Sequence, residues 1–411
     1  MKKTLSVIIY TAIIVLFTAV VSCGATLLFV AAGQLNNGET MTITLEDYEL
    51  LQRYQKLSTL SEALDLYYYE DVDQEVVENG AAYGMVASLG DPYSTYLTSE
   101  DMAALMESDS GEYVGIGGTF LTDPEDGSMV ITRIYPDSPL SQTDAQVGDR
   151  LYAVNGEVIL GMDSNSVAAM IKGDAGTSVT ITLLREGEQR EYTITRERVE
   201  VIDVDYRMLD GDILLVNLGA FSTNADTAFA EAIEYGQKQD MKSLIIDLRN
   251  NGGGDSLVLE NIADLLLPEG TIFYTEDKHG NRETFTSDAK YLGLPIVVLC
   301  DGNSASASEV LIAALQDYEL ATIVGTTTFG KAIGQSTLTL NEDGSGVYLT
   351  TIRVYSPQGR NWHGVGLEPD VVVELPDELA SNPISRNDDN DLQLQEAIRI
   401  LQGQTQGTDA A

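Results

Sequence analysis

The segment 301-DGNSASASEVLIAALQDYELATIVGTTTFGKAIGQ-335 carries the pattern that decides the fold. An apolar run, LPIVVLC at residues 294–300, comes just before it and predicts a buried strand. Small residues follow as a turn, then apolar positions at helical spacing, then a second short apolar run. A glycine-rich segment closes the pattern and contains Lys331, followed by Gln335. We therefore expect a strand, a helix that begins near Ser306 and a second strand, which is typical of an α/β fold.

Ser306 allows two interpretations. Residues 306–309, Ser-Ala-Ser-Glu, match a helix capping box, in which the serine and the glutamate satisfy free amides at the helix start. A serine held between a buried strand and a helix N-terminus is also well placed as a nucleophile, because the backbone amides there can stabilise an oxyanion. Taken alone, the motif favours the capping box.

A nucleophilic serine needs a base that takes its proton. The chain contains only His279 and His363, both in polar turn-like sequences, and it has no Gly-x-Ser-x-Gly motif. A histidine-based triad is therefore disfavoured, and a histidine-dependent hydrolase is kept as an alternative. Lys331 can act as the base if burial lowers its pKa, and no acidic residue flanks it in the sequence. In an extended segment Gln335 lies on the same face and can orient the amine, whereas a solvated loop lysine is the plain alternative.

A second glycine-rich turn occupies residues 244–255, LIIDLRNNGGGD, where an apolar strand runs into glycines and then into a helical pattern. This layout can bind a phosphate. However, no Lys-Ser or Lys-Thr pair follows the glycines, and a dinucleotide fingerprint does not fit either. A turn that points a backbone amide at an oxyanion and a plain tight turn both fit the sequence.

The pattern of the chain changes at a few points. A helical N-terminal region is followed by short alternating strands with one helix near Ser164–Lys172, which predicts a β-rich domain. Strands then alternate with helices, which predicts an α/β core with a mixed sheet. The expected regions are 1–35 for a membrane anchor or signal, 36–110 for the helical region, 111–199 for the β-rich domain, 200–376 for the α/β core and 377–411 for a C-terminal helix and polar tail.

The first residues predict a membrane segment. Lys2 and Lys3 precede an almost uncharged apolar run from Leu5 to Ala32, which is long enough to span a bilayer as a helix. The positive-inside rule then places the rest of the chain outside the cytoplasm. We expect a single-pass protein of the cell membrane, with a cleaved signal or a lipoprotein signal ending at Cys23 as the alternatives.

Charge and cysteine content narrow the possible partners. The formal net charge is −41, and nucleic-acid binding depends on Lys and Arg, so no nucleic-acid partner is expected. Cys23 lies in the apolar N-terminus and Cys300 at the end of a buried strand, which makes a bridge between them implausible.

Further motifs occur in a fixed order along the chain: 91-DPYSTY-96, 113-YVGIG-117, 147-VGDRLYAVNG-156, 247-DLRNNGGG-254, 304-SASASE-309, 330-GKAIGQ-335 and 366-GLEPD-370. Together they resemble the carboxyl-terminal processing proteases, also called tail-specific proteases, which are PDZ-containing serine peptidases with a Ser-Lys dyad. The resemblance covers the chain from about Leu60 onward. One departure is Gly252, where the family usually has proline.

The resemblance implies a role for each matching residue of the α/β core. Ser306 would be the nucleophile, Lys331 the general base and Gln335 the residue that supports the lysine. The oxyanion amides would come from Ala307 and from the glycine turn, with Gly253 as the expected donor. The departure at Gly252 puts the choice of glycine in doubt but leaves the dyad untouched. No metal and no cofactor are implied.

The resemblance identifies the β-rich region as a PDZ domain. Backbone amides of Gly115, Ile116 and Gly117 would hold the C-terminal carboxylate of a peptide that adds as a strand to the sheet edge. Val167 and Ile171 would line the pocket for an apolar terminal side chain. The plain alternative is a tight turn above core residues.

These observations lead to one expected function and one alternative. We expect an extracytoplasmic serine endopeptidase that recognises protein or peptide substrates by their C-termini and cleaves them through an acyl-enzyme. The alternative is a catalytically silent, PDZ-based peptide-binding scaffold. The resemblance further implies that PDZ placement can hold the enzyme inactive, which leaves room for a regulatory partner. The helical stretches Leu45–Tyr69 and Asp391–Leu401 suggest contacts in a homodimer.

Overall fold

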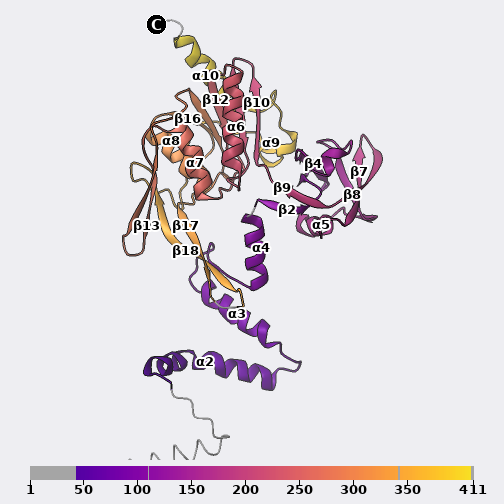
Figure 1. Cartoon of the computed structure of the whole chain (residues 1–411), viewed down its shortest axis with the longest axis vertical. Coiled ribbons are helices and arrows are strands. Elements are labelled where there is room, and N and C mark those ends of the chain that lie inside the picture. Colours follow the sequence, from indigo (N-terminus) through magenta and orange to yellow (C-terminus); the bar gives the residue numbers. More distant parts are fainter. Residues whose placement is uncertain (1–42, 110, 341–342, 409–411) are drawn as a thin grey trace, which may run out of the picture. The chain divides into compact units, whose positions relative to one another are not determined.

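The computed structural model describes residues 43–109, 111–340 and 343–408 (Figure 1). The chain divides into two compact units, one up to Ala81 and one from Ala82 onward. The predicted membrane segment, Leu5–Ala32, and Cys23 lie outside the described residues. Within the described ranges, no helix has both the length and the hydropathy needed to cross a membrane.

The first unit contains helix α2 (Leu45–Tyr67) and the beginning of α3 (Gln74–Ala87). A capping box starts α2: the Asp47 amide donates to Thr44 Oγ1 at 3.1 Å, and the Thr44 amide donates to Asp47 Oδ2 at 3.2 Å. No residue of α2 is buried, although apolar side chains recur along it at the predicted helical spacing. The predicted helix near Leu45–Tyr69 is confirmed, and within the part of the chain that the structure describes nothing buries its apolar face.

The β-rich domain contains two sheets. Its elements are β2 (Glu112–Gly115), β3 (Gly118–Thr122), β4 (Met129–Ile134), β5 (Arg150–Val154), β6 (Glu157–Val158), α5 (Ser164–Ile171), β7 (Ser178–Arg185), β8 (Glu188–Thr195) and β9 (Glu197–Glu200). The larger sheet has the order β3-β4-β5-β7-β8, with β6 paired to β5, and all its pairs are antiparallel. The entry and exit strands β2 and β9 pair with each other. In β7, Val179, Ile181 and Leu183 alternate into the domain core, as the period of two requires.

The α/β core is built on a sheet of order β10-β11-β12-β15-β16-β19. Its strands are β10 (Val204–Leu209), β11 (Ile213–Leu218), β12 (Ser243–Asp247), β15 (Ile296–Cys300), β16 (Ala321–Gly325) and β19 (Val371–Val372). The edge strand β10 pairs with β11 in the antiparallel sense, and the other pairs of this sheet are parallel. The parallel strands are buried on both faces, which explains why their sequences are continuous apolar runs.

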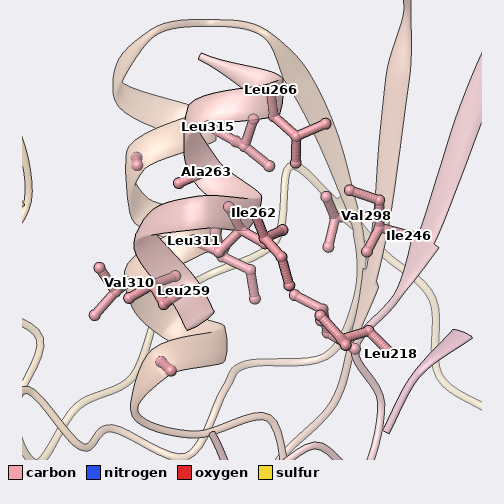
Figure 2. Packing of buried hydrophobic residues seen from close by; sticks show 14 of the residues in the cluster. Leu218, Ile246, Leu259, Ile262, Ala263, Leu266, Val298, Val310, Leu311 and Leu315 are labelled. Atoms are coloured by element: carbon pink, nitrogen blue, oxygen red, sulfur yellow. The ribbon is translucent and has the colours of Figure 1, made fainter. Parts of the chain in front are cut away.

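Helices cover both faces of this sheet. Helices α6 (Ala225–Lys238), α7 (Ser256–Leu266) and α8 (Ala307–Asp317) pack on one face, where Ile246 belongs to the larger hydrophobic cluster. Helix α10 (Leu392–Thr408) packs on the other, where its Leu394, Ala397 and Leu401 join Ile245, Val297 and Leu299. Figure 2 shows the first face, with side chains of α7 and α8 pointing toward Ile246 and Val298. Helix α10 extends to Thr408, further than the predicted end near Leu401.

A second sheet lies beside the first and was not predicted. It joins β1 (Thr95–Leu97), β13 (Gly270–Asp277), β14 (Arg282–Ser287), β17 (Ile333–Thr339) and β18 (Gly346–Tyr355) in antiparallel pairs. Strand β18 pairs with β17 and also with β1 and β13. A short strand that precedes the β-rich domain is therefore held in the same sheet as the strand that carries Gln335.

The core makes a stability prediction. Leu311 on α8 is fully buried among apolar residues, so Leu311→Ala should lower the free energy of unfolding by about 2–5 kcal/mol. Leu257 on α7 is 63% exposed and serves as the matched control. Leu257→Ala should change the free energy of unfolding by less than about 0.5 kcal/mol in denaturant titrations. Equal losses for the two variants would contradict the packing described.

Candidate active site

Ser306 occupies the turn between β15 and α8, in a strained backbone conformation. Its φ of 57° and ψ of −117° lie outside the regions that L-residues normally adopt. Such a conformation costs roughly 1–3 kcal/mol and persists only where the surrounding structure enforces it. A sharp strand-to-helix turn of this kind exposes a serine hydroxyl at the end of a sheet. The backbone at Ser306 therefore differs from an ordinary helix cap, which has extended geometry.

The glycine turn of residues 250–254 packs directly against this serine. A Cβ on Gly253 would lie 2.8 Å from Ser306 Cβ and 2.9 Å from the Ala307 amide nitrogen, and Gly253 has φ of 102°. Only glycine fits there. Asn251, fully buried, fixes the turn: its Nδ2 donates to Leu218 O at 2.7 Å, and its own carbonyl accepts from the Ala305 amide at 3.0 Å.

Glu309 joins the two loops of the site. Its side chain is fully buried at the first turn of α8. Oε2 accepts hydrogen bonds from the amides of Ser306 at 3.0 Å and Lys331 at 2.7 Å. Oε1 accepts from Thr328 Oγ1 at 2.6 Å and from the Gly330 amide at 2.7 Å. The sequence predicted the contact with Ser306 as part of a capping box, but it gave no sign of the three contacts with residues 328–331.

Lys331 precedes β17 and is half-buried. Desolvation lowers the pKa of its amine below the ordinary value of 10.5, while the charges of Asp91 and Glu309 act in the opposite direction. No acidic residue flanks Lys331 in the sequence, but the fold brings the carboxylates of Asp91 and Glu309 near it, so the expectation of a lysine without nearby carboxylates was wrong. Its Nζ lies 5.1 Å from the centroid of the Tyr93 ring, a cation–π distance.

One cleft of about 530 Å³ contains the predicted catalytic residues Ser306, Lys331 and Gln335. Among the described residues, no hydrogen bond joins Ser306 Oγ to Lys331 Nζ. The side-chain amide of Gln335 donates to Thr350 Oγ1 at 3.1 Å, so in this structure Gln335 contacts β18 instead of Lys331. The side chains thus share a cleft without forming the hydrogen bonds of an aligned dyad.

The predicted oxyanion donors differ in their availability. Ala307 is the first residue of α8, lines the cleft, and its amide makes no backbone hydrogen bond among the described residues. The Gly253 amide instead donates to Asn251 Oδ1 at 2.9 Å. Gly252 and Gly254 also line the cleft. The helix-start donor is therefore free, while the predicted glycine donor is occupied within the glycine turn.

Residues 91–94, Asp-Pro-Tyr-Ser, form a part of the site that the sequence suggested only through resemblance. Asp91 accepts from the Tyr93 amide at 3.0 Å and from Ser94 Oγ at 2.6 Å. Ser94 Oγ in turn accepts from the Thr350 amide on β18 at 3.0 Å. These bonds place Tyr93 beside Lys331, so a segment far away in the sequence contributes to the surroundings of the lysine.

An ion cluster behind the glycine turn connects it to the C-terminal helix. Arg249 Nη2 lies 2.6 Å from Asp247 Oδ2 and 2.8 Å from Asp391 Oδ2, and all three side chains are largely buried. Burial opposes the ionised form of Asp391, but the hydrogen bond and charge of Arg249 lower its pKa overall. The end of β12, from which the glycine turn starts, is thereby anchored to the beginning of α10.

The remaining wall of the cleft combines apolar side chains with polar ones, among them Thr223, Asp255 and Thr275. Its apolar side chains come from the second sheet, from the helices α7 and α8 and from the loop after β11, namely Ala220, Phe221, Leu259, Phe273, Phe285, Val310, Ile333, Tyr348, Ile352 and Val354. Neither histidine lines this cleft. His279 is exposed in a turn, and His363 is exposed with its ring centroid 6.2 Å from that of Tyr93. Within the described ranges, no group of three or more His, Cys, Asp or Glu side chains can hold a metal ion.

A second cavity, of about 660 Å³, lies where the β-rich domain meets the rest of the chain: residues of the domain line it together with Ala104, Asp203, Ala220 and Ser222. Ile116 and Ile171, two of the predicted peptide-binding residues, line it, whereas Gly115 and Gly117 do not. Val167 does not: it is fully buried in the domain core, and Ala168 takes the place on the cavity side of α5. The helical periodicity was predicted correctly, but the face of α5 toward the cavity is offset by one residue.

Comparison with known proteins agrees with this architecture. Residues 212–373 match the model for peptidase family S41, residues 130–185 match the PDZ domain, and residues 22–101 match the N-terminal domain of the activating protease CtpB. The chain is 32% identical over 367 residues to the carboxy-terminal processing protease CtpA of Bacillus subtilis (strain 168), which covers 89% of this chain and 77% of that protein.

Two further similarities point the same way. The carboxyl-terminal-processing protease of Synechocystis sp. (strain PCC 6803) is 33% identical over 330 residues, covering 78% of this chain and 75% of that protein. The solved photosystem II D1 C-terminal processing protease superposes with a TM-score of 0.50 at 28% identity, covering 81% of this chain and 95% of that one. The fold and these matches define a serine-type peptidase with a PDZ domain. The chain belongs to the carboxyl-terminal processing protease family.

Glu309 provides a test of the site geometry. Glu309→Gln keeps the size of the side chain but replaces one accepting oxygen by a donor group facing backbone amides. We expect peptidase kcat to fall at least about tenfold, because the backbones of Ser306 and Lys331 lose a shared acceptor. The exposed Glu368→Gln is the control and should keep full activity. Unchanged kcat in the Glu309 variant would show that its hydrogen bonds do not position the site.

Proposed function

We propose that this protein is an endopeptidase that uses Ser306 as nucleophile and Lys331 as general base. The observation that supports this most is a serine on a strained turn at a helix N-terminus that shares a cleft with a half-buried lysine of lowered pKa. A lysine amine accepts a proton only in its neutral form, which desolvation favours. The apolar side chains in the cleft wall, among them Phe273 and Val354, can accommodate an uncharged side chain next to the scissile bond.

The proposed reaction proceeds in two halves. The neutral Lys331 amine takes the proton of Ser306 Oγ while Oγ attacks the peptide carbonyl. The oxyanion of the tetrahedral intermediate accepts a hydrogen bond from the Ala307 amide. The protonated lysine then gives its proton to the leaving amine as the C–N bond breaks. Water hydrolyses the resulting ester by the same route, with Lys331 again accepting the proton. A rotation of the lysine side chain away from Tyr93 toward Ser306 is needed before the first step.

We further propose that the PDZ domain selects substrates by their C-termini. The support is a cavity lined by Ile116 of the loop and by residues of α5, among them Ala168 and Ile171. The unaligned Ser306 and Lys331 fit a resting state that a bound substrate or a regulatory partner would convert to the active one. A silent peptide-binding scaffold is the second candidate, since the same misalignment favours it.

The cellular placement is also a proposal. Lys2, Lys3 and the apolar run from Leu5 to Ala32 support an N-terminal membrane anchor with the catalytic part outside the cytoplasm. The exposed apolar side chains of α2 support a homodimer contact through that helix.

Substitution of the two residues tests the mechanism. Ser306→Ala and Lys331→Ala should each lower the rate of proteolysis of a flexible protein with an apolar C-terminus at least about a thousandfold. Lys331→Arg should be equally inactive, because a guanidinium stays protonated and cannot act as a base. The exposed Lys238→Ala is the control. Full activity in the Ser306 and Lys331 variants would refute the dyad, and tail-peptide binding without cleavage by the unaltered chain would favour the scaffold.

The pH dependence tests the role of the lysine separately. Only the neutral amine is active, so kcat/KM should rise with pH through the lowered pKa of Lys331, below 10.5. The charge of Asp91 raises that pKa, so Asp91→Asn should move the midpoint of the profile to lower pH. Glu231→Gln, exposed on α6, should leave the midpoint in place. A flat profile, or a midpoint that moves upward in the Asp91 variant, would exclude Lys331 as the base.

A further inference from the structure

The segment of residues 91–94 is fixed to strand β18. Ser94 is buried, and its Oγ accepts a hydrogen bond from the Thr350 amide at 3.0 Å. Strand β1, which follows directly, pairs with β18 as well. Within the segment, the Asp91 carboxylate accepts hydrogen bonds from the Tyr93 amide at 3.0 Å and from Ser94 Oγ at 2.6 Å. The backbone that carries the Tyr93 ring is therefore held in place against β18.

The Tyr93 ring contacts both the lysine of the site and a neighbouring loop. Lys331 Nζ lies 5.1 Å from the ring centroid. The centroid of the His363 ring is 6.2 Å away, with the two ring planes at 62°. The loop that carries this histidine is bonded to the residue before the lysine, because the Gly364 amide donates to the Gly330 carbonyl at 2.8 Å. The ring is thus packed among the segments that carry Lys331.

An aromatic ring attracts the protonated form of a lysine side chain. The cation–π attraction acts on the positive charge of the ammonium group and is absent for a neutral amine. In the part of the chain that the structure describes, neither Asp91 nor Glu309 lies within ion-pair distance of Lys331 Nζ, although both charges act on it. The Tyr93 ring is thus the contact that holds the ammonium group away from Ser306.

A second contact holds Gln335. This residue and Thr350 are opposite each other in the register of β17 and β18, and the side-chain amide of Gln335 donates to Thr350 Oγ1 at 3.1 Å. The backbone amide of the same threonine is the donor to Ser94. Thr350 therefore binds the segment that carries Tyr93 with its main chain and binds the glutamine with its side chain.

We propose that Tyr93 and Thr350 are positioning residues that keep the proposed base in its resting position. The Tyr93 ring holds the protonated Lys331 side chain, and the Thr350 hydroxyl holds Gln335 away from that lysine. This inference rests on the proposed Ser-Lys mechanism and names the side chains that oppose its alignment. The first contact ends when the lysine loses its charge, whereas the second is independent of charge. Both have to be replaced before Lys331 and Gln335 act on Ser306.

The pH dependence of proteolysis tests the role of Tyr93. The full chain is assayed with a flexible protein substrate that has an apolar C-terminus. Tyr93→Leu should raise kcat/KM about five- to tenfold below the midpoint of the pH profile and leave it unchanged well above it, because the ring no longer stabilises the protonated amine. The midpoint then moves to lower pH. Tyr93→Phe keeps an aromatic face and should behave as the parent chain, as should the control Tyr291→Leu, at a residue that is 45% exposed and outside the cleft.

The isosteric substitution Thr350→Val tests the second contact. It removes the hydroxyl but keeps the size and branching of the side chain, so Gln335 can turn toward Lys331. The kcat should rise about three- to tenfold at every pH, because one restraining hydrogen bond is lost. Thr350→Ser keeps the hydroxyl and should match the parent chain. Thr351→Val is the control, since it removes a hydrogen bond of 2.8 Å with Ser336 between the same two strands and should leave kcat unchanged.

The variants Ser306→Ala and Lys331→Ala separate this inference from the mechanism on which it rests. If either keeps full activity, the dyad fails and the inference fails with it. If both are inactive but Tyr93→Leu or Thr350→Val behaves as the parent chain, the role given to that residue is overturned while the mechanism stands. A loss of activity in Tyr93→Leu, or an equal gain at every pH, would also overturn the role of the ring. Should thermal unfolding show that Tyr93→Leu does not fold, Tyr93→Met fills the same space without an aromatic face, and its pH profile decides.

Discussion

The arrangement of the catalytic cleft depends on one buried carboxylate. Isolated in the interior, the charge of Glu309 would cost several kcal/mol, and four hydrogen bonds compensate for it. Two of these come from the backbones of the proposed nucleophile and base, so the two loops cannot separate without exposing an unpaired charge. The hydrogen bonds fix the main chain at both residues and leave their side chains free. In the proposed mechanism, Ser306 and Lys331 are therefore aligned by rotation of their side chains on a fixed backbone.

The parallel sheet provides the frame to which this carboxylate is attached. Strands β12 and β15 are neighbours, so the glycine turn after β12 and the serine turn after β15 meet at the same sheet edge. Ligand sites of open α/β sheets form at this edge for the same topological reason. The Arg249 cluster holds the glycine turn from behind, while the close approach of Gly253 to Ser306 sets the distance between the glycine turn and this serine. Burial of the sheet on both faces makes that frame rigid.

The sequence was sufficient for those parts of the fold and site that local patterns encode. Continuous apolar runs predicted β12 and β15, helical spacing predicted α7 and α8, and the Ser306 motif predicted where α8 begins. The second sheet was missed because β17 and β18 are half-exposed strands whose partners lie far away in the chain. The same cause hid the electrostatic action of Asp91 on Lys331, which depends on the pairing of β1 with β18. The error at Val167 arose because helical spacing gives a face only to within one residue.

The pairing of β2 with β9 has a consequence for how this chain can be built and altered. It brings the two ends of the PDZ domain side by side, with Glu112 opposite Glu200. A domain whose ends meet in this way interrupts its host at a single point, and closing the host chain without it requires only a short connection. The peptidase core is thus a continuous fold into which the PDZ domain has been inserted. Exchange of that domain for another of similar end-to-end spacing would leave the connection to the host chain unchanged.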